Sequence, residues 1–146
     1  MTVNVERPEI MVAFRRQGLR CTAQRYAIMK YLLKHPLHPT ADDIHQALNR
    51  VNPQASRATV YNGLHALTRA GLVREVSVAG HATRFESHVE HHHHFVCAQC
   101  GRIRDLAWFD VPGVAQKAGL NLRRVQAWEL VFHGVCDACG NQKRRN

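Results

Sequence analysis

Apolar side chains recur at helical spacing along the first half of the chain. Met11 to Arg16 belongs to a short amphipathic helix that ends at Gly18. The next stripe occupies one face of a helix, at i, i+1, i+4 and i+5: Ala27, Ile28, Tyr31 and Leu32. Thr22 is a favourable N-cap for this second helix. Pro36 ends it, because the residue before a proline avoids helical dihedral angles.

Two further helices follow, each with a recognisable start. Thr40 opens the third, and Asp43 stands three residues later in the manner of a capping box. Its predicted core positions are Ile44, Ala47 and Leu48. Ser56 caps the fourth helix and Gly71 stops it. Its predicted apolar face is Val60, Leu64 and Leu67. Gly63 lowers helix propensity there, which indicates close packing or close approach of a ligand.

The hydrophobic period changes after Gly71. Residues 72–78 and 82–85 have the composition of two strands around a turn at Ala79-Gly80. Helices followed by a β-hairpin are typical of a winged helix-turn-helix. In that motif the last helix before the hairpin enters a DNA groove.

A second region, rich in His and Cys, begins after Glu86. Its predicted strands are residues 95–97, 103–107 and 130–135. One short helix is predicted at residues 113–118. The prediction is therefore an α+β protein, with a winged helix-turn-helix domain at residues 1–86 and a small α/β domain at residues 87–146.

The charge changes this picture by pointing to a partner. Twenty Lys and Arg against eleven Asp and Glu give a net charge of +9. Such a surplus favours binding to a polyanion such as nucleic acid. A basic soluble protein without such a partner would have the same composition. The first ten residues lack the apolar core of a signal peptide, and no apolar run approaches the roughly 20 residues of a membrane span. We therefore expect a cytoplasmic protein with no membrane partner, in which disulfides are unusual.

Four of the five cysteines form two C-x-x-C pairs, each followed by glycine. They are Cys97, Cys100, Cys136 and Cys139. Two thiolates on a tight turn can face one ion, and two such turns supply a closed tetrahedral site for structural Zn²⁺. A redox dithiol is the alternative for a single pair. The fifth, Cys21, is interpreted as an unpaired residue at a helix junction, with a sensing role as the alternative.

Four consecutive histidines, His91 to His94, precede the first cysteine pair. On a strand His92 and His94 share a face, which makes half of a metal site. The candidates for the missing ligands are Glu86, Asp105 and His38. A nitrogen and oxygen shell without thiolates suits Fe(II), Mn(II) or Zn(II) at exchangeable affinity. A solvated linker or a cloning artefact would also explain the run.

Four motifs together resemble the ferric uptake regulator (Fur) family over nearly the whole chain. They are Gly18-Leu19-Arg20 with Thr22, Gln24 and Arg25; His38-Pro39-Thr40-Ala41; Ala58-Thr59-Val60-Tyr61; and the H-x-H-x-x-C-x-x-C-G run from His92 to Gly101. The resemblance implies an N-terminal winged helix hinged to a C-terminal dimerisation domain. It also implies a homodimer that a regulatory metal locks in a DNA-binding shape.

The predicted sites follow from the motifs and this resemblance. The regulatory ligands are His38, Glu86, His92, His94 and Asp105. The predicted contacts to double-stranded DNA with a palindromic operator are Arg20, Arg57, Thr59, Tyr61 and Asn62. We expect phosphate contacts from the two arginines and a base contact from Asn62.

The branch of the family is indicated by a few positions. Asn62 and Asp105 are similar to the peroxide-sensing branch, whereas Glu86 stands where that branch normally has aspartate. Ala127 and Trp128 occupy the region in which many iron sensors have a further histidine ligand. We therefore expect a repressor that peroxide releases through a bound Fe(II), with sensing of iron or manganese, or less favourably zinc or nickel, as alternatives.

Two other classes of protein compete with a repressor. An enzyme could activate water at an open His/carboxylate metal site. No motif supplies a substrate pocket or a dedicated general base, so we expect no enzymatic activity. The other class is a protein-interaction module stabilised by zinc, in which the excess of Lys and Arg would have no role in binding. Metal-dependent DNA binding separates this module from a repressor.

Overall fold

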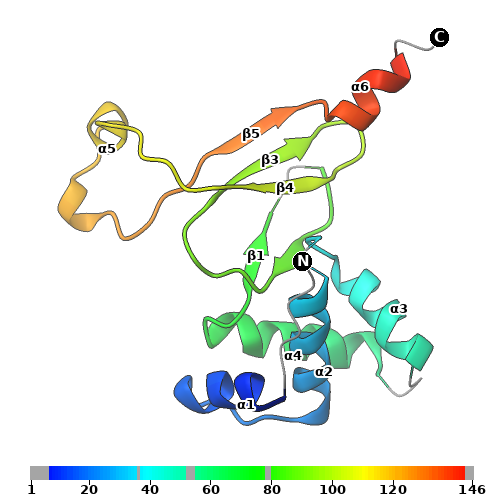
Figure 1. Ribbon diagram of the computed structural model, residues 1–146. Helices are drawn as coiled ribbons and strands as arrows, with labels where there is room; N and C mark the ends of the chain where they lie inside the picture. The colour runs from blue at the N-terminus through cyan, green and yellow to red at the C-terminus, as the bar shows by residue number, and fades with distance from the viewer. Residues whose placement is uncertain (1–6, 36, 52–54, 78–79, 144–146) are drawn as a thin grey trace. The chain divides into compact units, whose positions relative to one another are not determined.

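The computed structural model describes residues 7–35, 37–51, 55–77 and 80–143. The chain divides into two compact units, Met1–Val89 and Glu90–Asn146, called the N-terminal and C-terminal units below. Helices and a short β-hairpin form the first, and a small sheet with short helices forms the second (Figure 1). The α+β fold class is confirmed. Among the described residues, no helix combines the length and apolar character needed to cross a membrane.

The N-terminal unit begins with four helices in its described part. They are α1 (Arg7–Arg16), α2 (Ala23–Lys34), α3 (Ala41–Val51) and α4 (Arg57–Arg69). Two caps are formed as predicted: Thr22 Oγ1 accepts from the backbone N–H of Arg25 at 3.3 Å, and Ser56 Oγ accepts from that of Thr59 at 3.1 Å. Each bond satisfies a donor in the first turn of its helix. Pro36 and Pro53 lie outside the described residues.

The start of α3 is a complete capping box. Asp43 Oδ2 accepts from the backbone N–H of Thr40 at 2.9 Å and from its hydroxyl at 2.7 Å. Thr40 Oγ1 accepts in return from the backbone N–H of Asp43 at 3.1 Å. The backbone and side-chain hydrogen bonds from Thr40 hold the pKa of Asp43 below its ordinary value. The predicted box is confirmed.

The core of the N-terminal unit lies where the helices meet. Its largest fully buried side chains include Phe14, Ile28, Leu32, Ile44, Leu64 and Leu67. On α2 the prediction is partly wrong, because Met29 is buried while Ala27 and Tyr31 are only half-buried. The reason is that α2 packs against α1, α3 and α4, so neighbours cover more of it than a single stripe.

Gly63 lies on the buried face of α4. A Cβ atom built there would lie 2.5 Å from Cδ1 of Ile28 on α2. This contact decides between the two explanations of Gly63 in favour of close helix packing.

The hairpin after α4 is shorter than predicted. Strands β1 (Arg74–Val76) and β2 (Arg84–Glu86) pair antiparallel, with Glu75 opposite Phe85. Leu72 is not in the strand, because its N–H donates to Leu67 O at 3.0 Å and completes the end of α4. Val78 and Ala79, which the predicted strand and turn include, lie outside the described residues. Strand β2 begins two residues later than predicted.

The C-terminal unit is a three-stranded sheet with the order β4-β3-β5 (Figure 1). Its strands are β3 (His93–Cys97), β4 (Ile103–Leu106) and β5 (Val131–Gly134). Strand β3 pairs antiparallel with β4 but parallel with β5. A parallel pair needs a long crossover, which here carries α5 (Val114–Lys117) and a 3₁₀ turn, η1 (Leu122–Arg124).

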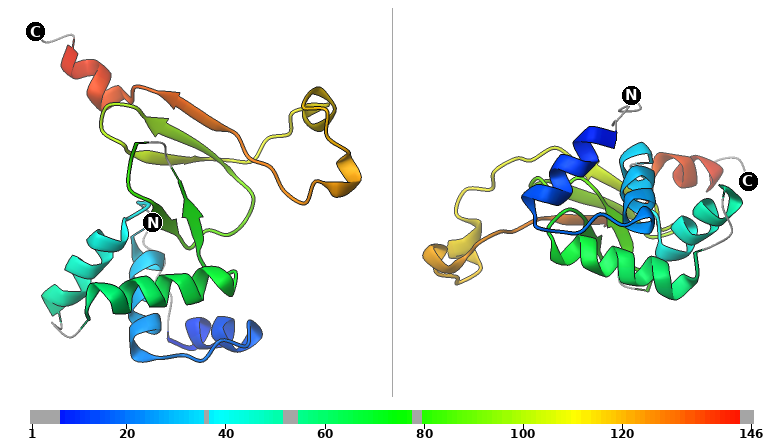
Figure 2. Two further views of the ribbon diagram at one scale, coloured as in Figure 1. Left: turned by 180° about the vertical axis from the view of Figure 1, so that it is seen from behind. Right: turned by 90° about the horizontal axis from the view of Figure 1, so that it is seen from below.

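Short helices lie at the two ends of this sheet. The segment with α5 extends from one end, and α6 (Asp137–Lys143) lies at the other (Figure 2). The α5 helix falls within its predicted range. The sequence pattern missed η1 and α6, because neither shows an apolar stripe at helical spacing.

Candidate metal centres and nucleic-acid interface

Two tight turns of the C-terminal unit present the cysteine quartet. After β3, Gly101 donates its N–H to Cys97 O at 2.9 Å and has a positive φ of 67°. At the start of α6, the N–H of Gly140 bonds to Cys136 O at 2.8 Å. The parallel pairing of β3 and β5 ends with Cys97 opposite Gly134. This register brings the second turn beside the first.

The four sulfur atoms of this quartet converge. Those of Cys97, Cys100, Cys136 and Cys139 all lie within 4.8 Å of one another. Cys100 Sγ is 3.8 Å from Cys136 Sγ, and Cys97 Sγ accepts from the backbone N–H of Cys136 at 3.3 Å. One ion can therefore reach all four, as a tetrahedral Zn²⁺ requires. A redox dithiol needs only one pair and leaves the second unexplained.

The thiols of this cluster do not ionise alike. Hydrogen bonds from the backbone N–H groups of Cys136 and Cys100 lower the pKa of Cys97 to about 6. Contacts with the thiols of Cys136 and Cys100 raise the pKa of Cys139 to about 12. Without a cation, the contacts with the other thiols thus oppose ionisation of Cys139. A bound divalent ion removes this opposition, because metal ligands bind as thiolates.

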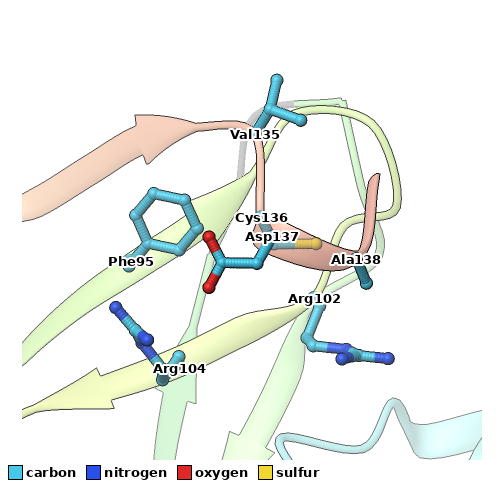
Figure 3. Close-up of a pocket in the computed structure, with 7 residues that line it drawn as sticks. All are labelled: Phe95, Arg102, Arg104, Val135, Cys136, Asp137 and Ala138. Atoms are coloured by element: carbon cyan, nitrogen blue, oxygen red, sulfur yellow. The ribbon is translucent and has the colours of Figure 1, made fainter. Parts of the chain in front are cut away.

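A hollow of about 290 Å³ lies beside the quartet, and Figure 3 shows Asp137 and Arg104 on its wall. The guanidinium of Arg104 lies 5.6 Å from the centre of the Phe95 ring. Cys136 is part of the same lining. Cys21 is remote in sequence from this cluster and packs half-buried against the core of the N-terminal unit.

Two of the predicted regulatory ligands meet within the N-terminal unit. His38 Nε2 lies 2.8 Å from Glu86 Oε2, and both side chains are at least 95% buried, with exposures of 3% and 5%. His38 has a positive φ of 51°, which is uncommon for a residue with a Cβ atom. Arg84 Nη1 donates to His38 O at 3.1 Å, and Arg74 Nε lies 3.5 Å from Glu86 Oε1. Arg84 thus joins β2 to the loop before α3, and Arg74 joins β1 to the end of β2.

The other three predicted ligands converge within the C-terminal unit. The rings of His92 and His94 have centroids 4.5 Å apart. Asp105 on β4 stands opposite His94 on β3. Its Oδ1 lies 3.6 Å from His92 Nε2 and 3.9 Å from His94 Nε2. Two imidazole nitrogens and one carboxylate oxygen thus surround one point, and this donor set suits Fe(II), Mn(II) or Zn(II).

His93, whose role the sequence left open, has a structural one. Its Nε2 is 3.0 Å from Phe109 O, and its Nδ1 accepts from the N–H of Leu130 at 3.2 Å. The ring centroid lies 4.6 Å from that of Trp108 and 5.4 Å from that of Trp128. Both nitrogens are engaged and the residue is fully buried. His93 therefore holds the crossover segment against β3.

Sequence reasoning missed one charged neighbour of this cluster. Glu129 Oε2 lies 3.7 Å from His94 Nδ1, the ring nitrogen that faces away from Asp105. The parallel pairing of His94 with Val131 brings the two residues together. Spacing along the chain offers no signal for such a contact.

The face of α4 opposite the core is open. Tyr61 is 54% exposed, and Asn62 and Arg57 are exposed as well. Arg57 Nε lies 3.5 Å from Asp42 Oδ1. The hydroxyl of Thr59 is 2.8 Å from Ser56 Oγ, within the helix cap. Arg20, also exposed, lies just before α2.

Known proteins resemble the chain over most of its length. The model described as the Ferric uptake regulator family matches residues 16–123. Peroxide-responsive repressor PerR of Staphylococcus epidermidis is 35% identical over 143 residues, covering 94% of this chain and 93% of that protein. The Peroxide operon regulator of Bacillus subtilis is 36% identical over 142 residues, covering 94% and 96%.

Among solved structures, the Campylobacter jejuni peroxide stress regulator is 27% identical and superposes with a TM-score of 0.67. The similarity covers 92% of this chain and 100% of that one. The resemblance inferred from the motifs, including the peroxide-sensing branch, is confirmed.

Proposed function

Because the chain belongs to the ferric uptake regulator family, we propose that it is a metal-dependent DNA-binding repressor that peroxide releases from its operator. The observation that carries this proposal is the convergence of His92, His94 and Asp105 around one point. Relatives named as a peroxide-responsive repressor and a peroxide operon regulator support peroxide as the signal. A family of regulators also disfavours the enzymatic alternative.

We assign a structural Zn²⁺ to the cysteine quartet. Four thiolates within reach of one ion fit this metal, and its binding energy adds to the stability of the C-terminal unit. The ion would join the end of β3 to the start of α6. Removal of any one sulfur should therefore loosen the unit as a whole.

We further propose that the C-terminal unit forms a homodimer. Strand β5 lies at the edge of the described sheet and exposes Val131 and Phe132, which are 38% and 44% exposed. A second copy would cover these apolar side chains. In this assignment residues 1–86 bind DNA, and residues 87–146 provide dimerisation and most of the regulatory ligands.

The regulatory ion, Fe(II) or Mn(II), would take its ligands from both units. His38 and Glu86 form one half of the ligand set, and His92, His94 and Asp105 form the other. An ion that binds both halves favours one arrangement of the units over all others. By linkage, a DNA site that fits this arrangement raises metal affinity, and metal raises DNA affinity.

Peroxide sensing follows from the same ligands. Bound Fe(II) would supply the redox chemistry, and the overall change would be the transfer of one oxygen atom from H₂O₂ to a ligand imidazole, with water as the other product. His38 and His92 are the candidate acceptors. An oxidised imidazole is a weaker ligand, so the ion would be held less tightly and the metal-dependent DNA affinity would fall. Mn(II) on the same ligands would hold DNA without this response.

DNA recognition is assigned to α4, one helix per subunit, in the major groove of a palindromic operator. Tyr61 and Asn62 lie on its exposed face and can reach base edges. Arg57 and Arg20 are suited to phosphate contacts, which position a protein without reading sequence. Thr59 supports the contact region through the helix cap.

A repressor that follows iron or manganese concentration alone is the second candidate. The longer side chain of Glu86, in place of the aspartate typical of the peroxide-sensing branch, favours it. Both candidates share the metal and DNA sites and differ only in their response to peroxide.

Fluorescence anisotropy with a duplex selected from a random library tests the proposal. The zinc-loaded protein should bind it tightly with Mn(II) or Fe(II) and weakly without either. His92→Ala should abolish this metal dependence. The matched control His35→Ala, an exposed histidine directly after α2, should preserve it. DNA binding that is equally tight with and without metal would overturn the proposal.

A further inference from the structure

The imidazole of His94 lies between two carboxylates of the C-terminal unit. Nε2 is 3.9 Å from Asp105 Oδ1, and Nδ1 is 3.7 Å from Glu129 Oε2. The ring is completely buried, whereas the side chain of Glu129 is 37% exposed. Because the two nitrogens of an imidazole point in diverging directions, an ion at Nε2 lies on the opposite side of the ring from Glu129. Glu129 is therefore outside the ligand set.

His92 shows what the second nitrogen of a ligand histidine requires. Its Nδ1 lies 2.7 Å from the backbone carbonyl of Glu90, so Nδ1 carries the proton. A neutral imidazole has one N–H, and its other nitrogen is then free to bind metal. Nε2 of His92, which lies 3.6 Å from Asp105 Oδ1, is then the nitrogen left for a metal ion. For His92 the backbone alone defines the tautomer.

His94 needs the same tautomer, and the structure offers Glu129 at its Nδ1. We propose that Glu129 is a positioning residue of the regulatory metal site, which holds the His94 proton on Nδ1 and so leaves Nε2 for the ion. This inference rests on the proposed function. A carboxylate at the far nitrogen of a ligand histidine raises its basicity and fixes the ring orientation.

The separation of 3.7 Å is longer than a direct hydrogen bond. A small rotation of the half-exposed carboxylate shortens it, and one bridging water spans it equally well. The backbone of the segment is already held in place. The N–H of His94 donates to Leu130 O at 3.0 Å, and the N–H of Leu130 donates to His93 Nδ1 at 3.2 Å. Only the side chain of Glu129 has to adjust.

The first test measures the tautomer directly. In the zinc-loaded protein without regulatory metal, ¹⁵N-histidine NMR should show His94 protonated on Nδ1. Glu129→Ala should populate the Nε2–H form. Glu129→Gln should retain the Nδ1–H form, because its amide oxygen still accepts. Asp110→Asn, which removes another exposed carboxylate of the same unit, should change nothing. An unchanged His94 tautomer in Glu129→Ala would refute the positioning role.

The second test is a Mn(II) titration of the same proteins. Glu129→Ala should bind Mn(II) about 10- to 100-fold more weakly, the range for loss of such an outer partner. Glu129→Gln should be intermediate, and the zinc content should stay at one per chain in all variants. Affinity of Glu129→Ala within twofold of the parent would also refute the proposal.

The two proposals fail in distinguishable ways. If the parent protein binds DNA without regard to Mn(II), the proposed function is wrong. If the parent depends on Mn(II) but Glu129→Ala depends on it equally, the function stands and only the role of Glu129 is wrong. His94→Ala serves as the positive control for loss of a ligand.

Discussion

The contact between α4 and α2 at Gly63 allows a sharp test of how the DNA-binding helix is held. In Gly63→Ala the new Cβ lies 2.5 Å from Cδ1 of Ile28. Alanine gains about 1 kcal/mol of helix propensity over glycine. Overpacking in a filled core costs about 1–3 kcal/mol, and Ile28 is completely buried, so its side chain has little room to move. The expected net loss is about 1 kcal/mol.

Ile28→Val removes the atom that clashes. Alone it should cost about 1 kcal/mol, as is usual for loss of one buried methyl group. Combined with Gly63→Ala, the helix-propensity gain remains while the clash disappears. The double variant should therefore regain roughly the parent stability, whereas independent effects would sum to a loss of about 2 kcal/mol.

Thermal unfolding at fixed protein and zinc concentration measures this difference. A loss of 1 kcal/mol corresponds to a fall in Tm of about 4 °C for a chain of this size. DNA affinity should follow the same order, because a displaced α4 moves Tyr61 and Asn62 with it. Additive losses in the double variant would refute the packing argument.

Three further predictions concern single residues. Cys97→Ser should lose zinc, measured by atomic emission, and should loosen or dissolve the dimer in size-exclusion chromatography; a folded dimer with unchanged Tm contradicts the zinc assignment. Asp43→Ala should destabilise α3 by about 1 kcal/mol. The lowered pKa of Asp43 makes this contribution complete above the unfolded value of about 3.9, and it is lost as the pH falls through the folded pKa. Unfolding of parent and variant from pH 7 to pH 2 should therefore converge at low pH, and a constant difference argues against the capping box. Asn62→Ala should change the ratio of cognate to scrambled DNA binding, whereas Arg57→Ala should weaken both and reduce the salt slope by about one; an unchanged ratio for Asn62→Ala means that the residue is misassigned.

The helix starts were predictable because their determinants are local. Thr22, Ser56 and the Thr40–Asp43 pair all bond within three residues. The cysteine quartet was predictable for another reason: thiol chemistry and C-x-x-C spacing restrict what four cysteines can do. The burial of side chains on α2 was harder to predict from the sequence, because neighbouring helices cover Met29, which lies outside the predicted apolar stripe.

The surroundings of the metal ligands depend on contacts far apart in sequence. The N–H of Leu130 reaches the ring of His93 across 37 residues. The parallel pairing of β3 and β5 places Glu129 beside His94. A parallel pair joined by a long crossover has no local turn signal. The sequence therefore identified candidate ligands but neither the structural role of His93 nor the presence of Glu129.

Peroxide treatment of the Fe(II)-loaded, zinc-containing dimer tests the central claim most directly. Peptide mass spectrometry and DNA binding are measured on the same sample, with the Mn(II)-loaded protein as control. With Fe(II) we expect a gain of one oxygen atom on His38 or His92 and loss of DNA binding, and with Mn(II) we expect neither change. Unmodified histidines, with DNA binding that follows metal concentration alone, would contradict peroxide sensing.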